Sequence, residues 1–240
     1  MMILALVAVS AMGKEMPPQG FGVHIGWAQP ILRLNMPTNP SSAKDSLTTH
    51  IKMYGFKAGV VYDGSFIAGF GTSIGLNYTF GMSNSGWSSV NPNYGKYPQQ
   101  RRLITYQELE LFVDWQYKFE IAKGTYLILY TGPTLQCGLG LTMRQDKREE
   151  NLITGNMETT YGIQYSGYSN EADPDQVFKR LNVTWGVGAG FQYQRYFLRG
   201  GYDFGLIVPY KNADFANGYH TRGRLDQWSI KIGAYLWYEK

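Results

Sequence analysis

Seven charged side chains fall inside stretches where large apolar residues alternate with small or polar ones. Alternation with a period of two places neighbouring side chains on opposite faces of a β-strand, and all seven charges lie on the small or polar face. Acids and bases gathered on one face could carry protons or ions, bind a charged ligand, or neutralise one another as a packed plug. These residues are Lys57, Glu108, Glu110, Asp114, Arg199, Asp203 and Lys231.

The histidines offer a second possible chemistry. A hydrolytic or acyl-transfer site needs a histidine beside a nucleophile and a carboxylate. The chain has three histidines, His24, His50 and His220, and no G-x-S-x-G elbow accompanies any of them. We therefore predict no catalytic residue.

Metal and cofactor motifs are missing from the sequence as well. No H-E-x-x-H, C-x-x-C or EF-hand loop occurs, and acidic residues scattered through loops are usually solvated. The single cysteine, Cys137, excludes an internal disulfide and a cysteine-based zinc site. We expect neither a metal nor a cofactor.

Composition indicates which elements carry these residues. Of the 240 residues, 44% are hydrophobic and 15% aromatic, and 29 are glycine. Aromatic and glycine enrichment without long helix-forming runs favours an all-β protein. The net charge of +4 is modest and its cations are interleaved with acids, so nucleic acid is not an expected partner.

Eight stretches alternate along the chain, and the connections between them are alternately short and long. The long polar connections lie near 35–50, 81–102, 143–180 and 207–225. This pattern predicts an eight-stranded antiparallel up-and-down barrel with turns at one end and loops at the other. Its strands lie near 20–29, 54–62, 69–80, 105–117, 126–141, 181–193, 197–206 and 227–238.

The orientation of the strands follows from three stretches that carry no charge, Gly69–Phe80, Thr125–Thr142 and Leu181–Tyr193. A soluble barrel needs a solvated outer face rich in charged residues. If the bulky apolar side chains face lipid instead, the small and polar ones fill a narrow interior. We predict a transmembrane barrel whose charged lumen is a plug, because eight strands leave little room for a channel. The alternative is a soluble lipocalin-like ligand-binding barrel with the faces reversed.

Two prolines conflict with regular strands. Pro133 lies inside the fifth stretch, where we predict a β-bulge. Pro30 is expected to bend or end the first strand.

The N-terminus predicts a targeting signal. Residues 1–13 hold a short apolar run, and Ala11 and Gly13 are placed as a small-residue cleavage site. The mature barrel would then cover residues 14–240. The alternative is a buried N-terminal segment, because the usual positive n-region is missing.

The segment YQELELFVDWQYKFEIAKGTYLILYTGPTLQCGLG resembles outer-membrane β-barrel domain proteins of Gram-negative bacteria, the "porin family" or PorT-like proteins. That family shows L-E-x-P-L-L-x-K-Y before a strand containing G-P. Here Leu109–Val113 lacks the usual proline, while Gly132 and Pro133 match. Leu198–Leu206 is similar to the family's penultimate strand.

The resemblance implies a barrel in the bacterial outer membrane with short periplasmic turns and long extracellular loops. It implies contact with outer-membrane lipid and lipopolysaccharide, and leaves protein partners possible through the loops. It implies no enzymatic activity. We expect a structural or interaction role, with three alternatives: a PorT-like accessory protein of a secretion system, a lipid-modifying outer-membrane enzyme, and the soluble barrel above.

Overall fold

The computed structural model describes residues 17–37, 46–67, 69–89, 99–151, 154–168, 178–208 and 222–239. The predicted signal peptide, residues 1–13, and His220 lie outside these residues. Every regular element within them is a β-strand. No described helix is long and apolar enough to cross a membrane.

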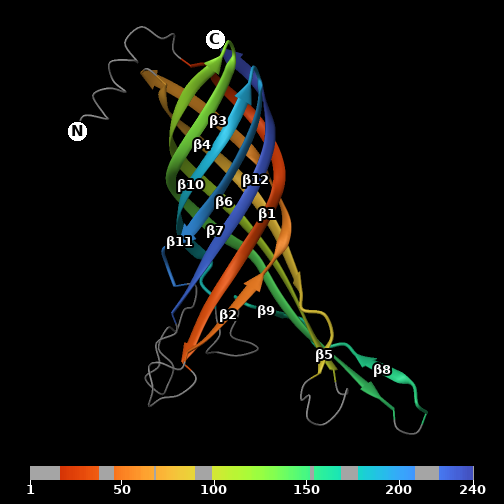
Figure 1. Ribbon diagram of the computed structural model, residues 1–240. Coiled ribbons are helices and arrows are strands. Elements are labelled where there is room, and N and C mark those ends of the chain that lie inside the picture. Colours follow the sequence, from red (N-terminus) through yellow and green to blue (C-terminus); the bar gives the residue numbers. More distant parts are fainter. Residues whose placement is uncertain are drawn as a thin grey trace.

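Eight strands form a closed antiparallel ring (Figure 1). Each strand pairs with the next one along the chain, and the last pairs with the first to close the ring. The prediction of an eight-stranded up-and-down barrel is confirmed. The ring consists of β1 (Gln19–Pro37), β3 (Tyr54–Ile67), β4 (Phe70–Asn84), β6 (Gln99–Ala122), β7 (Thr125–Glu150), β10 (Leu181–Tyr193), β11 (Tyr196–Gly205) and β12 (Arg222–Glu239).

The two ends of the barrel differ. At one end, here the turn end, β6–β7 and β10–β11 are joined by two-residue turns, and Gly124 and Gln194 take the positive φ that these turns require. β1 begins and β12 ends there too (Figure 1). At the other end, here the loop end, the connections are long. Outer-membrane barrels place short turns in the periplasm and long loops outside the cell.

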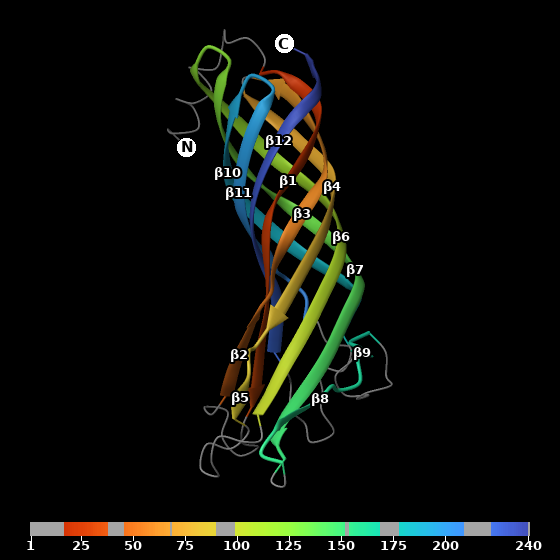
Figure 2. The same ribbon diagram turned by 90° about the vertical axis from the view of Figure 1, so that its right-hand side faces the viewer.

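Four short strands lengthen the wall at the loop end. β2 (Ser46–Lys52) pairs with β1, and β5 (Ser88–Ser89) pairs with β6. β8 (Met157–Thr160) and β9 (Tyr165–Ser166) both pair with β7. The hairpin of β6 and β7 therefore stands well beyond the closed part of the barrel (Figures 1 and 2).

The outer surface of the ring is apolar and the inside is polar. Ile232 and Leu76 are 60% and 53% exposed, whereas Lys57 and Glu108 inside are 1% and 0% exposed. This is the reverse of a soluble barrel, and only a bilayer makes such a surface favourable. We call this outer surface the apolar belt; it includes Val23, Ile25, Trp27, Phe56, Ile74, Leu76, Leu109, Leu111, Trp115, Leu127, Leu129, Leu135, Trp185, Val187, Phe191, Leu198, Trp228, Ile230 and Ile232.

Inward glycines let neighbouring strands approach closely. A Cβ at Gly55 would lie 1.7 Å from the carbonyl oxygen of Phe80, and one at Gly132 would lie 2.1 Å from that of Val113. Both contacts are with backbone, which cannot move aside without breaking the ladder. The small residues of the alternation are therefore required by the ring itself.

The prediction of a bulge at Pro133 is wrong. The register between β6 and β7 is unchanged across it, and the ladder skips only the two residues opposite Gly132 and Pro133, where proline cannot donate a hydrogen bond. The two register shifts between β6 and β7 lie elsewhere, where Gln107 and Glu108 face Gly140 and Gly138, and between Glu120 and Ala122.

Pro30 does not end the first strand. β1 continues through it to Pro37, and the carbonyl of Pro30 accepts a hydrogen bond of 2.9 Å from the amide of Met53. At this point the partner of β1 on one side changes from β3 to β2. The N–H that proline lacks therefore falls at the break between the two strand pairings, where no ladder hydrogen bond is lost.

The belt predicts a large cost for a charge at Leu111, which is 43% exposed. Leu111→Arg should lower the free energy of unfolding in lipid vesicles by about 2–4 kcal/mol, as for a cation near the bilayer midplane. Denaturant titration of the refolded barrel measures this. Thr160→Arg, on exposed β8, serves as the control and should cost little; equal costs at both positions would contradict the membrane orientation.

Candidate functional site: a charged lumen closed toward the loop end

A buried ion cluster occupies the lumen nearest the turn end. Asp63, from β3, is completely buried and lies 2.5 Å from Nη2 of Arg199 on β11 and 3.1 Å from Nζ of Lys118 on β6. The hydroxyls of Ser73 and Tyr235 also donate to its carboxylate. Two cations and two neutral donors satisfy this carboxylate, as a buried charge requires.

A second cluster surrounds Glu110 further along the lumen. Nζ of Lys57 lies 2.7 Å from Oε2 of Glu110. Asn77 Nδ2 and Thr79 Oγ1 each donate to the same carboxylate at 2.9 Å. Asn77 Oδ1 in turn contacts Nε2 of His24 at 2.7 Å, which ties the only described lumen histidine into a structural network.

Glu108 is held by neutral donors. It accepts hydrogen bonds from the Tyr106 hydroxyl at 2.6 Å and from Nε2 of Gln227 at 2.7 Å. It is completely buried, and no cation of the described residues lies within ion-pair distance of it. Its neighbour toward the loop end is Tyr106, which belongs to an apolar layer.

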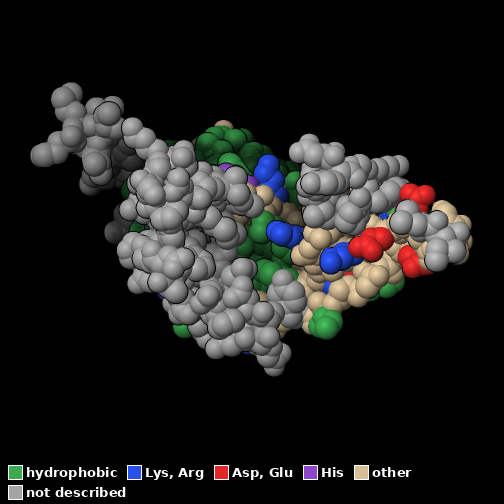
Figure 3. All heavy atoms as spheres, turned by 90° about the horizontal axis from the view of Figure 1, so that it is seen from below, with side chains coloured by type: hydrophobic (Ala, Val, Ile, Leu, Met, Phe, Trp, Pro, Cys, Tyr) green, Lys and Arg blue, Asp and Glu red, His purple; other side chains and the backbone are tan. Residues whose placement is uncertain are grey.

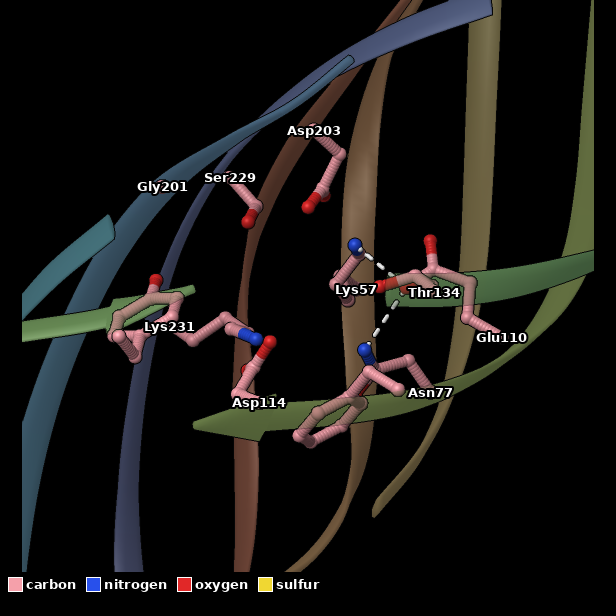
Figure 4. Close-up of a pocket in the computed structure, with 11 residues that line it drawn as sticks. Lys57, Asn77, Glu110, Asp114, Thr134, Gly201, Asp203, Ser229 and Lys231 are labelled. Atoms are coloured by element: carbon pink, nitrogen blue, oxygen red, sulfur yellow. Dashed lines mark hydrogen bonds and ion pairs between the residues drawn. The ribbon is translucent and has the colours of Figure 1, made fainter. Parts of the chain in front are cut away.

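The remaining three charges surround a small cavity at mid-lumen (Figure 4). Asp114, Asp203 and Lys231 line it, and none of them forms an ion pair within 4.0 Å among the described residues. Lys57 and Glu110 line its other side. The cavity volume is about 20 Å³, which is room for one or two ordered waters between the charged groups.

One apolar layer closes the lumen toward the loop end; it is formed by Leu32, Met53, Ile104, Tyr106, Leu141, Phe178 and Leu225. Phe178 comes from the long connection before β10 rather than from the barrel wall. A second apolar group, Val61, Phe112, Phe197 and Tyr235 with Tyr238 packed against it, lies among the charges rather than beyond them. Asp63 and Lys118 follow Val61 and Phe112 toward the turn end, and the Tyr235 hydroxyl donates to Asp63.

Beyond the belt, the outer wall carries two clusters in which a buried aspartate holds two arginines. Both contain the sequence R-x-D, which puts arginine and aspartate on the same face of a strand. In the first, Asp226 Oδ2 lies 2.7 Å from Nε of Arg33 and 3.0 Å from Nε of Arg224. The Tyr202 hydroxyl donates to Oδ2 at 2.7 Å, and the amide of Gly205 donates to Oδ1 at 3.0 Å.

The second cluster lies on the extended β6–β7 hairpin. Asp146 Oδ2 lies 2.7 Å from Nη2 of Arg101, and Oδ1 lies 3.0 Å from Nε of Arg144. Burial raises the pKa of the Asp146 carboxyl, but the hydrogen bonds from Arg101 and from the amide of Gly162, with the charge of Arg144, hold that pKa below its ordinary value. Trp87 covers Arg101, whose guanidinium carbon lies 4.7 Å from the ring centroid.

The structure places the seven predicted residues on the inner side of the ring but does not gather them in one cluster. Lys57 pairs with Glu110, and Arg199 belongs to the separate cluster of Asp63. The analysis of the sequence missed Asp63 and Lys118. Extending the alternation to these positions, one residue beyond the stretches assigned above, would have placed both on the inner face.

The other singled-out residues do not assemble a reactive site. His50 is exposed on β2, on the outer side of the wall. Cys137 is half-buried in β7. Neither lies near the lumen charges.

Comparisons with known proteins find distant similarity to solved structures of bacterial surface and barrel proteins. No family model and no curated protein matches the sequence. Ail of Yersinia pestis, solved with the heparin analogue sucrose octasulfate, is 11% identical with a TM-score of 0.40 and covers 90% of this chain and 97% of its own. Neisserial surface protein A is 11% identical with a TM-score of 0.39 and covers 92% and 99%.

The N-terminal barrel domain of Pseudomonas aeruginosa OprF is 11% identical with a TM-score of 0.31 and covers 91% of this chain and 98% of its own. The fold assignment for this chain rests on the closed ring and the apolar belt described above.

The Lys57–Glu110 pair predicts an asymmetry between two neighbouring glutamates. Glu110→Gln leaves the buried ammonium of Lys57 without its counter-charge and should cost about 3–5 kcal/mol of unfolding free energy. Glu108→Gln removes no ion pair and should cost clearly less. Denaturant titration of both variants in the same vesicles gives the comparison, and equal losses would contradict this assignment of partners.

The Asp146 cluster predicts acid sensitivity of the extended hairpin. Because the folded pKa lies below the ordinary value of 3.8, the stabilisation is complete above that value and is lost as the pH falls through the folded pKa. The protection factors of the β7 and β8 amides, that is, their exchange rates corrected for the intrinsic rate at each pH, should therefore fall on acidification below about pH 4. Asp146→Asn should remove this pH dependence; its persistence in the variant would assign it to another group.

Proposed function

We propose that this protein is a non-enzymatic barrel of the bacterial outer membrane with a structural or interaction role. The observation that carries the proposal is the closed lumen. The ion clusters of Asp63 and Glu110 fill the lumen, and an apolar layer covers it toward the loop end. A barrel filled in this way offers a partner its outer wall and its loop end, not its interior.

The loop end is the surface that supports an interaction role. The β6–β7 hairpin and the β1–β2–β12 sheet both project beyond the ring (Figures 1 and 2). On the described part of this face, basic and acidic side chains lie close together (Figure 3). A rigid, hydrogen-bonded extension holds such groups at fixed positions outside the membrane, which favours contact with extracellular or membrane-bound partners.

Residues 1–13 are proposed to direct export and to be removed, leaving Lys14 at the mature N-terminus. Mass spectrometry of the N-terminal peptide from the outer-membrane fraction tests this cleavage. Recovery of the protein from that fraction, with heat-modifiable migration on gels, tests its location.

Membership of the PorT-like proteins, and an accessory role in protein secretion, extend the proposal on the basis of the sequence resemblance alone. Crosslinking in membranes followed by pull-down would find a secretion partner if one exists. Lipid A mass spectra with and without the protein test the enzymatic alternative, and a changed acyl or phosphate pattern would overturn the non-enzymatic assignment.

The closed lumen predicts no conductance. In planar bilayers the folded protein should give no ion-channel steps, because packed side chains fill the lumen and an apolar layer blocks its loop end. A sixteen-stranded porin in the same bilayers serves as positive control. Regular channel steps that depend on the folded protein would contradict the plug.

A further inference from the structure

A row of basic side chains crosses three adjacent strands on the outer wall near the loop end. Arg33 of β1 is the direct cross-strand partner of His50 on β2 and of Arg224 on β12. Directly opposed residues of an antiparallel pair lie on the same face. Ile25 and Trp27 of β1 are exposed on the belt while His24 and Ala28 point inward. Arg33 is an even number of residues from Ile25 and Trp27 along the same strand, so it faces outward as they do.

The next row adds a fourth basic group. Ile31 is opposed by Lys52 on β2 and by Asp226 on β12. Lys52 is exposed, whereas Asp226 is completely buried beneath its two arginines. Counting Arg33, Arg224 and Lys52 against Asp226 gives this patch a net charge of +2 with His50 neutral.

Asp226 pairs with Arg33 and Arg224, but neither arginine side chain is fully buried by that contact. Their side chains remain 34% and 47% exposed at Arg33 and Arg224. Arg33 also donates from Nη2 to the Tyr202 hydroxyl at 3.1 Å. The aspartate fixes the inner edge of each guanidinium, and the outer edge stays open to a second anion. Arginine is well suited to this because its planar donors match the oxygens of a phosphate.

The patch lies at the height of lipid headgroups. Trp228, in the belt, follows Asp226 by two residues and Arg224 by four along β12. At about 3.4 Å per residue and a strand tilt near 40°, Asp226 stands about 5 Å and Arg224 about 10 Å above Trp228. The polar region outside the hydrocarbon core is about 5–8 Å thick on each side. The basic row therefore borders the phosphates of the adjacent leaflet.

We propose that Arg33, Arg224 and Lys52 form a binding site for the phosphate groups of the glycolipid lipid A in the outer leaflet. The occupant follows from the position, because the patch is at the loop end, faces outward and carries excess positive charge next to an aromatic rim. The site rests on the proposed function in one respect, that the barrel lies in the outer membrane with its loops outside.

The purified full-length protein in detergent, exchanged into nanodiscs, tests the site by native mass spectrometry of retained lipid. The probes are diphosphorylated lipid A, its dephosphorylated form and phosphatidylglycerol, with inorganic phosphate as competitor. We expect retention of diphosphorylated lipid A and about tenfold less of it in Arg33→Gln/Arg224→Gln, as loss of charge-assisted hydrogen bonds predicts. Arg33→Lys/Arg224→Lys should keep most of the retention, since lysine binds phosphate as a point charge.

The second arginine cluster supplies a matched control. Arg101→Gln/Arg144→Gln disrupts the same kind of aspartate-centred arrangement, but Arg101 stands about 20 Å above Leu109 of the belt by the same strand geometry. Its retention of lipid A should equal that of the unmodified protein. Equal loss in both double variants would reduce the effect to general surface charge and overturn the site.

Three further results would also overturn the proposal: unchanged retention in Arg33→Gln/Arg224→Gln, equal retention of dephosphorylated lipid A or phosphatidylglycerol, or displacement of lipid A by an equimolar amount of inorganic phosphate. Folding of every variant is checked by heat-modifiable migration. A protein that never inserts into bilayers would fail the proposed function itself, whereas an inserted barrel without preference for lipid A would fail only this inference.

Discussion

The structure depends on one constraint: a polar group within the hydrocarbon core of the bilayer cannot hydrogen-bond to water and must find its partner in the protein. The backbone meets it by closing the sheet, so that each strand has a neighbour on both sides. The side chains satisfy it by the way they point: bulky apolar groups face lipid, and charged groups face the interior, where they find oppositely charged or hydrogen-bonding partners. The pairing of β1 with β12 and the pairing of Lys57 with Glu110 answer the same requirement at two levels.

The content of the lumen follows from its width. Inward glycines such as Gly55 and Gly132 bring strand backbones so close that a methyl group would collide with a carbonyl oxygen. The space that remains is filled by long polar side chains that reach across it, as Arg199 reaches Asp63 from the opposite wall. Such a lumen stabilises the barrel, and an apolar layer toward the loop end separates it from water.

The alternation along the sequence was sufficient to predict the eight ring strands and the inward direction of seven charges, because a period of two is a local property. It could not predict which charges meet. Arg199 and Asp63 are far apart in the chain, and their contact depends on the register of several intervening strands. Pro133 was misjudged because the effect of a proline depends on which neighbour its missing N–H would have faced. The strand extensions β2, β5 and β8 lie in stretches too polar for the alternation to mark.

The closing seam between β1 and β12 has a kinetic consequence. Its partners, from Gln19 with Glu239 to Asn35 with Arg222, lie near the two ends of the described residues, so this seam joins residues farther apart in sequence than any other strand pair of the described sheet. Contacts between residues far apart in sequence form late, because the chain loses conformational entropy on closing the loop before the new contacts stabilise the sheet. Until β1 pairs with β12, the sheet has two edge strands with unpaired backbone groups and an exposed apolar outer surface. Such a chain must be kept from aggregating with other copies of itself before it inserts into the bilayer.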